Sequence, residues 1–240
     1  MASTYLTRTM SGGSATTTKF TFSAWVKRTG LNASDGSHIL SVSNEYIYLG
    51  FANDTMRMEL HDADNVRLRS TRVFRDTNAW YHVVFMFDST QATASDRMKM
   101  WVNNEQITSF SVENYPSQNY GSYIGGNTQH TLGRRENDDS DYFDGILAHA
   151  HLCVGYAYSP SDFGETDSTT GIWKPKTSPS VTYGNNGFFL KFENSGAMGT
   201  DSSGNSNTFT VNGTMTQLID TPSNVFATIN PLAPASISDI

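Results

Sequence analysis

The sequence predicts an all-β fold, either a sandwich or a barrel. Three observations lead to this prediction. Aromatic residues make up 12% of the chain and 19 residues are Gly; aromatic side chains suit pleated sheets, whereas Gly suits turns. Apolar and polar residues alternate over short runs, which is the period of a half-buried strand. Almost no segment repeats its apolar residues at the helical spacing of about 3.6.

The first half of the chain contains the clearest strands. In residues 19–27, Phe20, Phe22, Ala24 and Val26 share one face, because successive side chains of a strand point to opposite faces. Residues 80–88 are almost continuously apolar, which is typical of a central strand covered on both faces. The strands predicted in this half span residues 19–27, 46–51, 55–60, 65–73, 80–88 and 97–102.

Shorter runs continue into the second half. Turn residues separate most of them, which is the spacing of a sandwich or barrel. The one predicted helical turn spans residues 159–163, with Ser159 as N-cap and Pro160 at the first helical position. The remaining predicted strands span residues 123–125, 129–133, 146–156 and 187–193.

The chain has 240 residues and no linker that would divide it, so one domain with a sizeable core is expected. We predict that this domain spans residues 1–220. Residues 221–240 contain three prolines and lack alternation. We expect them to form an extended C-terminal tail that packs on the body or on a neighbour.

Charge and composition argue against several functions. The net charge of -7 and the pI of about 5.2 oppose binding to nucleic acid, which requires a basic face. No stretch approaches the roughly 20 apolar residues of a membrane span. The N-terminus lacks the apolar core of a signal peptide, which predicts synthesis in a cytoplasm.

Cys153 is the one cysteine, so it cannot form an intrachain disulfide, and we expect it to be a small buried apolar residue.

Four segments resemble laminin-G-like, concanavalin A-like domains. Residues 80–88 resemble the family's central strand, which begins with Trp-x-His-Val, and residues 101–107 resemble its next hairpin. Residues 142–152 resemble the strand that closes the sandwich, with His149 where an acidic residue is common. Residues 158–164 resemble the short turn that follows. The resemblance implies a jelly-roll sandwich of the concanavalin A type.

The chain is more similar still to laminin-G-like modules of marine bacteriophage virion proteins. This resemblance covers most of residues 4–226, and it implies a capsid decoration or a tail or fibre protein that is assembled in the host cytoplasm. The partners implied are other virion proteins of the capsid or tail, further copies in a homo-oligomer, and host surface glycans. The strings that carry it are residues 21–28, 88–97, 114–120, 163–176 and 199–205.

The order of the segments differs from that of the family. Residues 187–193, followed by 201–205, resemble the segment that usually begins such a domain, but here they come last. The resemblance therefore implies a circular permutation, or a unit cut from a tandem array in a shifted frame. Either is feasible when the terminal strands are neighbours. We expect the strand at 187–193 to lie beside the strand at 19–27 or another strand of the same sheet.

The chain lacks the carboxylate pattern of the hydrolases on this fold, Glu-x-Asp-x-x-Glu, which places an acid and a base on one strand. Its nearest approach, Glu59 to Asp62, is interpreted as a polar strand end and turn. Arg67 and Arg69 would share a strand face, as in a lyase cleft, but a solvated face or a partner contact is the preferred interpretation. The sequence therefore predicts a protein that is not an enzyme.

One acidic cluster is dense enough to bind Ca²⁺, which is the commonest ion of the family that the chain resembles. Carboxylate and carbonyl oxygens are its preferred ligands. The segment lacks the spacing of an EF-hand loop, so a solvated turn is the alternative interpretation. No other cofactor is indicated. The candidate ligands are Asp138, Asp139, Asp141 and Asp144.

A set of Tyr and Asn residues is the candidate for contact with a glycan or a partner protein. Aromatic faces and amide groups suit sugars, and Tyr also suits protein interfaces because it buries a large area at low entropic cost. The candidate residues are Tyr115, Asn119, Tyr120, Tyr123 and Tyr142.

Together these features predict a non-enzymatic structural protein on the surface of a phage virion that adheres to host surface glycans. A free carbohydrate-binding lectin module is the alternative, and a polysaccharide-degrading enzyme is a third.

Overall fold

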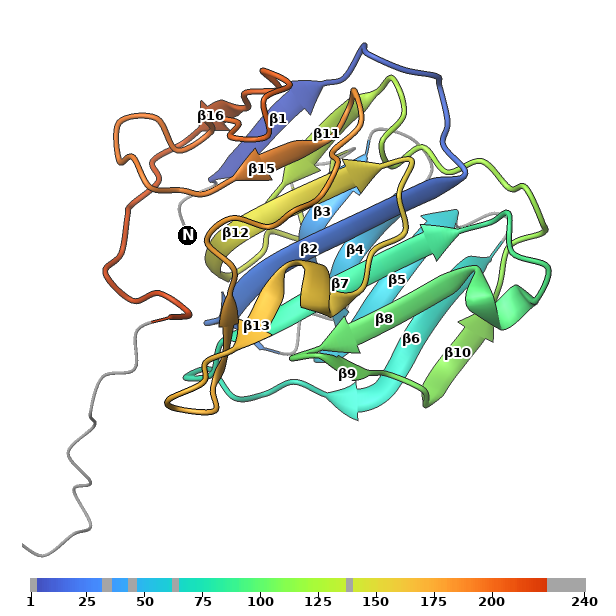
Figure 1. The fold of residues 1–240 in the computed structure, drawn as a ribbon, viewed down its shortest axis with the longest axis horizontal. Helices are drawn as coiled ribbons and strands as arrows, with labels where there is room; N and C mark the ends of the chain where they lie inside the picture. Colours follow the sequence, from blue (N-terminus) through green and yellow to red (C-terminus); the bar gives the residue numbers. More distant parts are fainter. Residues whose placement is uncertain (1–3, 32–35, 43–46, 62–64, 137–139, 224–240) are drawn as a thin grey trace, which may run out of the picture.

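Two antiparallel sheets pack face to face in the computed structural model (Figure 1), as predicted. The structure describes residues 4–31, 36–42, 47–61, 65–136 and 140–223. Among these residues it has sixteen strands and two short 3-10 helices, η1 (Ala94–Asp96) and η2 (Pro160–Asp162). Neither helix is long or apolar enough to cross a membrane. The predicted turn at Pro160 is confirmed as η2, with Ser159 and Asp162 in a capping box.

The larger sheet has eight strands and the smaller has six. The larger runs in the order β10-β6-β5-β4-β3-β11-β1-β16 and the smaller in the order β15-β12-β2-β7-β8-β9. The larger comprises β1 (Tyr5–Thr9), β3 (Ser37–Val42), β4 (Ile47–Ala52), β5 (Thr55–His61), β6 (Val66–Val73), β10 (Phe110–Asn114), β11 (Gln129–Leu132) and β16 (Thr210–Asn212). The smaller comprises β2 (Lys19–Arg28), β7 (Tyr81–Asp88), β8 (Met98–Val102), β9 (Glu105–Gln106), β12 (Gly145–Val154) and β15 (Phe188–Leu190).

Most predicted strands are present within one or two residues of their expected bounds, but the strand predicted at 123–125 is wrong. These residues form a turn in which Gly126 N donates to Tyr123 O at 2.9 Å, and Gly125 adopts a φ of 82°. The strand predicted at 187–193 is shorter than expected and ends at Leu190. Soon after it, Phe192 adopts a φ of 61°, a conformation that cannot continue a strand.

The apolar core lies between the sheets. Phe20 and Phe22 of β2 pack against Phe87 and Phe85 of β7, with ring centroids 5.3 and 6.4 Å apart. All four rings are fully buried, and full burial of such a side chain contributes roughly 1.5–3 kcal/mol. The alternation read along residues 19–27 therefore corresponds to the inward face of the central strand of the smaller sheet.

The outer face of the smaller sheet is covered as well. The hairpin of β13 (Gly164–Thr166) and β14 (Trp173–Pro175) crosses it, and Figure 1 shows β13 in front of this sheet. Trp173 lies on His82 beneath, with ring centroids 5.9 Å apart. This cover explains why every residue of β7 is buried. Cys153 lies on the same sheet, is buried as expected, and has a thiol pKa raised by burial.

The late strand β15 pairs with β12, which also pairs with β2. The registers Ala150↔Leu190 and Leu152↔Phe22 define these neighbours. The strand expected at 187–193 therefore belongs to the same sheet as β2, and that expectation is confirmed. Of the predicted tail, residues 224–240 lie outside the described residues, whereas residues 221–223 lie at the rim of a cavity.

Candidate functional site

A cavity of about 900 Å³ opens between the two sheets. Ligand sites of proteins commonly have volumes of roughly 300–1,000 Å³. One wall comes from β1 and the turn after β11, and the opposite wall from β12 and residues 191–193. Residues 214–221 complete the rim; they belong to the orange-to-red segment at the left of Figure 1. The cavity is therefore built from segments far apart in the sequence.

Five half-buried aromatic side chains line this cavity: Tyr5, Trp80, Tyr142, Phe143 and Phe192. Tyr5 and Tyr142 are close, with ring centroids 6.4 Å apart. The guanidinium of Arg134 lies over the Tyr5 ring at 3.7 Å from its centroid. Because the rings are half-buried, part of their surface faces the cavity and can contact a ligand.

Two bulky residues of the cavity wall have backbone conformations that are rare for such side chains. His149 has a φ of 48° and Phe192 a φ of 61°, and a positive φ is rare for bulky side chains. His149 occupies an irregularity of β12, where the register with β2 shifts between Ala148 and His151. Each such conformation costs on the order of 1–3 kcal/mol and tends to occur at functional sites. The bulge and the turn after β15 therefore mark this end of the sandwich as the candidate site.

His149 is the one histidine that lines the cavity among the described residues. Burial lowers its pKa, Glu193 opposes this effect, and Lys191 adds to it. Its Nδ1 atom is buried and has no hydrogen-bond partner among the described residues. At neutral pH the ring is therefore uncharged.

The segment 217–220 crosses the rim and is held by side-chain contacts. The Asp220 carboxylate accepts hydrogen bonds from Lys27 Nζ at 2.7 Å and from Trp80 Nε1 at 3.1 Å. These bonds hold the Asp220 pKa below its ordinary value. Gln217 Nε2 donates to the carbonyl oxygens of Phe192 at 3.1 Å and Glu193 at 2.7 Å. We call residues 217–220 the strap.

The predicted calcium ligands do not all fall within the described residues. Asp138 and Asp139 lie outside them. Asp141 forms an ion pair with Arg135 at 3.0 Å, and Asp144 lines the cavity. Within the described ranges, no three His, Cys, Asp or Glu residues are grouped to hold a metal ion. Calcium binding by this segment stays a prediction.

The structure separates the predicted Tyr and Asn set into two places. Tyr115, Asn119, Tyr120 and Tyr123 lie in the connection that docks on the start of β2, where Ser122 pairs with Thr17. Tyr142 lies near the end of β2, since the next-but-one residue, Asp144, accepts backbone hydrogen bonds from Thr29 and Gly30. The ten residues of β2 separate these places by roughly 30 Å. The five residues therefore cannot form one surface.

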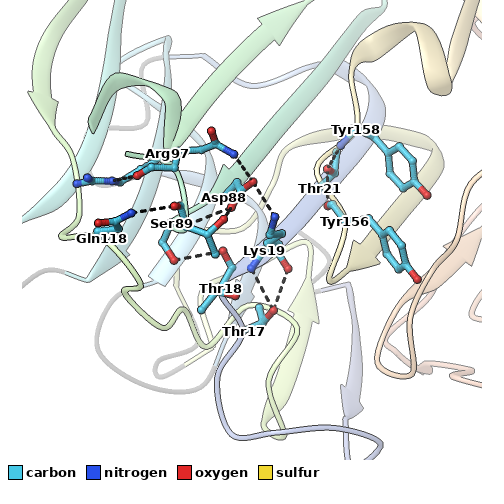
Figure 2. A network of polar contacts seen from close by, with 12 residues as sticks. Thr17, Thr18, Lys19, Thr21, Asp88, Ser89, Arg97, Gln118, Tyr156 and Tyr158 are labelled. Atoms are coloured by element: carbon cyan, nitrogen blue, oxygen red, sulfur yellow. Dashed lines mark hydrogen bonds and ion pairs between the residues drawn. The ribbon is translucent and has the colours of Figure 1, made fainter. Parts of the chain in front are cut away.

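The connection around Asn119 is anchored by a polar network (Figure 2). Asn119 N donates to Ser89 O at 2.8 Å, and Ser89 Oγ donates to Tyr120 O at 2.7 Å. Gln118 Nε2 donates to Thr90 O at 3.0 Å, and Lys19 pairs with Asp88 at 3.0 Å. This network holds the corner of the sandwich, and it assigns these polar groups a structural role.

The sequence did not predict several residues that the structure places in the cavity or in an aromatic pair. Trp80 was attributed to a strand, and nothing in the local sequence marks Asp220 as its partner. Tyr156 and Tyr158 were also missed. Their rings stack with centroids 5.8 Å apart and planes 14° apart, and Figure 2 shows both rings directed away from the polar network. The one sequence signal for this pair is that Tyr156 and Tyr158 lie two positions apart, which places both rings on the same side of an extended segment.

Ser23 and His82 are a serine and a histidine in contact, with Oγ and Nε2 2.8 Å apart. Trp173 Nε1 donates to the other ring nitrogen, Nδ1, at 3.0 Å. Because an indole N–H can only donate, Nδ1 must accept, and the proton of the neutral ring resides on Nε2. Nε2 therefore donates to Ser23 and cannot remove its proton, so this pair does not form an activated nucleophile.

Comparison with known proteins places this fold in a family. The model described as the concanavalin A-like lectin/glucanases superfamily, laminin G type, matches residues 2–162. No curated protein matches the chain in sequence. A candidate carbohydrate-binding protein of Bacteroides ovatus is similar in structure, with 14% identity, a TM-score of 0.50, and coverage of 88% of this chain and 58% of that one.

Two further solved structures are similar over shorter regions. Domain 4 of a Geobacillus stearothermophilus extracellular arabinanase has 15% identity, a TM-score of 0.41, and coverage of 61% of this chain and 65% of that one. The Trypanosoma rangeli sialidase has 15% identity, a TM-score of 0.42, and coverage of 60% of this chain and 22% of that one. The chain thus spans less than two thirds of each structure, and at such identities the likeness concerns the fold alone. The family match over residues 2–162 shows that the chain belongs to the concanavalin A-like lectin/glucanase superfamily.

Proposed function

We propose that this chain is a non-enzymatic carbohydrate-binding protein whose ligand occupies the cavity between the sheets. The observation that carries the proposal is a cavity of about 900 Å³ that is lined by the aromatic rings of Tyr5, Trp80 and Tyr142. The C–H faces of a sugar pack on aromatic rings, and its hydroxyl groups bond to a few fixed polar groups. Asp144, Gln217 and Asp220 supply such groups at the rim.

The polar groups favour binding over catalysis. A general acid in a glycosidase needs a raised pKa, whereas the pKa of Asp220 is lowered by Lys27 and Trp80. Glu59, the nearest approach to a hydrolase motif, is fully buried and paired with Arg57 and Arg67. Ser23 lacks a base, because the proton of His82 lies on the nitrogen that faces it. These observations support a protein that holds its ligand without transforming it.

The biological setting proposed is the surface of a phage virion. The chain would serve there as a capsid decoration or as a tail or fibre appendage, in a homo-oligomer that contacts other virion proteins and adheres to host surface glycans. The resemblance of residues 163–176 and 199–205 to virion modules supports this setting. Antibody labelling of purified particles tests it: label on the capsid or tail agrees with the proposal, whereas recovery in the unassembled fraction alone favours a free lectin.

Binding is tested with the full chain on a glycan array, followed by calorimetry with the best ligand. We expect Trp80→Ala to weaken binding at least tenfold, because it removes a ring of the cavity wall. Tyr156→Ala is the matched control, since Tyr156 is an exposed aromatic residue at the opposite end of β2. Equal affinity of the Trp80 variant and the wild type would place the ligand elsewhere, and a soluble product released from the ligand would reveal an enzyme.

A further inference from the structure

We infer that the cavity selects its sugar by charge, taking amine-bearing sugars in preference to uncharged ones and rejecting acidic ones, and that Asp144 is the residue responsible. This inference rests on the proposed function and names the ligand class of the same site. It depends on how the charged side chains around the cavity are paired.

Three of the four carboxylates that line the cavity have cationic partners. Asp141 pairs with Arg135 at 3.0 Å, Glu193 with Lys191 at 3.6 Å, and Asp220 with Lys27 at 2.7 Å. In each pair the positive charge offsets the negative one, so the pair exerts little net charge on a ligand in the cavity. These three carboxylates are therefore already compensated by groups of the protein.

Asp144 is the fourth carboxylate, and no ion pair joins it to any described residue. Its backbone oxygen accepts hydrogen bonds from Thr29 N at 2.9 Å and Gly30 N at 3.2 Å, so its position is fixed. The carboxylate packs against Gly30, where an added Cβ would lie 2.6 Å from Oδ2. His149 does not offset this charge, because burial lowers its pKa. Asp144 is thus the one carboxylate of the cavity lining without an ion pair to a described residue.

The Asp144 carboxylate lies near aromatic rings, which also favour a cationic ligand. A cation over the face of a Trp or Tyr ring is attracted by its quadrupole, and Trp80 and Tyr142 share the cavity with Asp144. One face of the Tyr5 ring is already occupied by the Arg134 guanidinium. A concave site with one sign of charge also concentrates ions of the opposite sign. A sugar carboxylate or sulfate would meet a like charge and lose hydration without a partner.

The test is calorimetry of the full chain with three oligosaccharides of equal length. They are oligomers of glucosamine, of N-acetylglucosamine and of galacturonate, at about pH 6, where amines are protonated and carboxylates are ionised. We expect glucosamine oligomers to bind roughly threefold to tenfold more tightly than the N-acetylated ones, and galacturonate oligomers to bind more weakly than both. The preference should decline as salt is added, because screening acts on exposed charges.

Asp144→Asn is the decisive variant and Asp96→Asn the matched control. Both remove one negative charge, but Asp96 lies in η1 and pairs with Lys99, far from the cavity. We expect Asp144→Asn to bring the amine-bearing and N-acetylated ligands to equal affinity, and Asp96→Asn to retain the preference. Sugar binding without a charge preference, or a preference that survives Asp144→Asn, would overturn this inference alone. Absence of binding to any sugar would instead remove the proposed function, and this inference with it.

Discussion

Arg28 of β2 and Asp54 of the turn between β4 and β5 form an ion pair of 2.9 Å that joins the two sheets. Their side chains are 1% and 0% exposed. Arg28 Nη1 also donates to Phe74 O, and its guanidinium lies 4.7 Å from the Phe51 ring centroid. Asp54 forms a second pair, with Arg75 at 2.8 Å, but the Arg75 side chain is 60% exposed. One carboxylate therefore has one buried and one exposed partner.

This difference predicts unequal costs for two otherwise similar substitutions. Arg28→Met should lower the free energy of unfolding by about 3–5 kcal/mol, because it leaves buried polar groups without their partner. Arg75→Met should lower it by about 1 kcal/mol or less, since exposed ion pairs contribute little. Urea denaturation of both variants measures the two values. Equal losses would show that burial does not decide the strength of this network.

Acid should destabilise the fold through its buried histidines. Burial, and to a smaller extent His149, lowers the His82 pKa from 6.5 to about 3, and burial lowers the His130 pKa to about 4. Between these values and 6.5 the unfolded chain binds more protons than the folded one. The stability that these rings contribute is therefore complete above pH 6.5 and is lost as the pH falls through that window.

The slope of the free energy of unfolding against pH tests the contribution of His82. Between about pH 6.5 and pH 5, each such ring contributes up to about 1.4 kcal/mol per pH unit to the decline in the free energy of unfolding. His82→Gln should reduce the slope by about that amount, whatever its effect on stability at neutral pH. Urea titrations at several pH values give the slope. An unchanged slope in the variant would mean that His82 is not protonated on unfolding in this range.

The strap should open locally when its anchor is weakened. Asp220→Asn removes the ion pair with Lys27 and weakens the bond to Trp80. We expect faster amide hydrogen exchange in residues 214–221 and a change of about 1 kcal/mol or less in global stability, because the pair is partly exposed. Exchange measured by mass spectrometry reports on this segment. Asp167→Asn, which breaks a comparable pair with Lys174, should leave exchange in the strap unaltered.

The Cys153 thiol should be unreactive in the folded protein. It is fully buried, and burial raises its pKa, whereas the thiolate is the reactive form. A chromogenic disulfide reagent should therefore label about one thiol per chain in urea and almost none under native conditions. Rapid labelling of the native protein would show that the packing around Cys153 opens readily.

Local sequence determined the main strands, because period-two alternation is a property of neighbouring residues. It put Phe20 and Phe22 on one face of a strand, whereas the continuous apolar run at 80–88 predicted a central strand covered on both faces. It failed for β3, where a register shift between His38 and Leu40 breaks the alternation. It also did not predict β1, β9, β10, β13, β14 and β16, each of which has five residues or fewer. The turn at 123–125 was misread as a strand because Tyr123 and Ile124 are apolar, whereas Gly125 sets the turn.

The candidate site was decided by tertiary structure. Tyr5, Trp80, Tyr142 and Asp220 come from four distant parts of the chain, and they meet because β12 pairs with both β2 and β15 and the chain then returns across the rim. The predicted Tyr and Asn set was separated for the same reason, since β2 places its two ends roughly 30 Å apart. Composition and periodicity determined that this protein is all-β, and the resemblance of its motifs to concanavalin A-like domains selected the sandwich over the barrel. Long-range pairing, which local patterns do not encode, decided which side chains share a cavity.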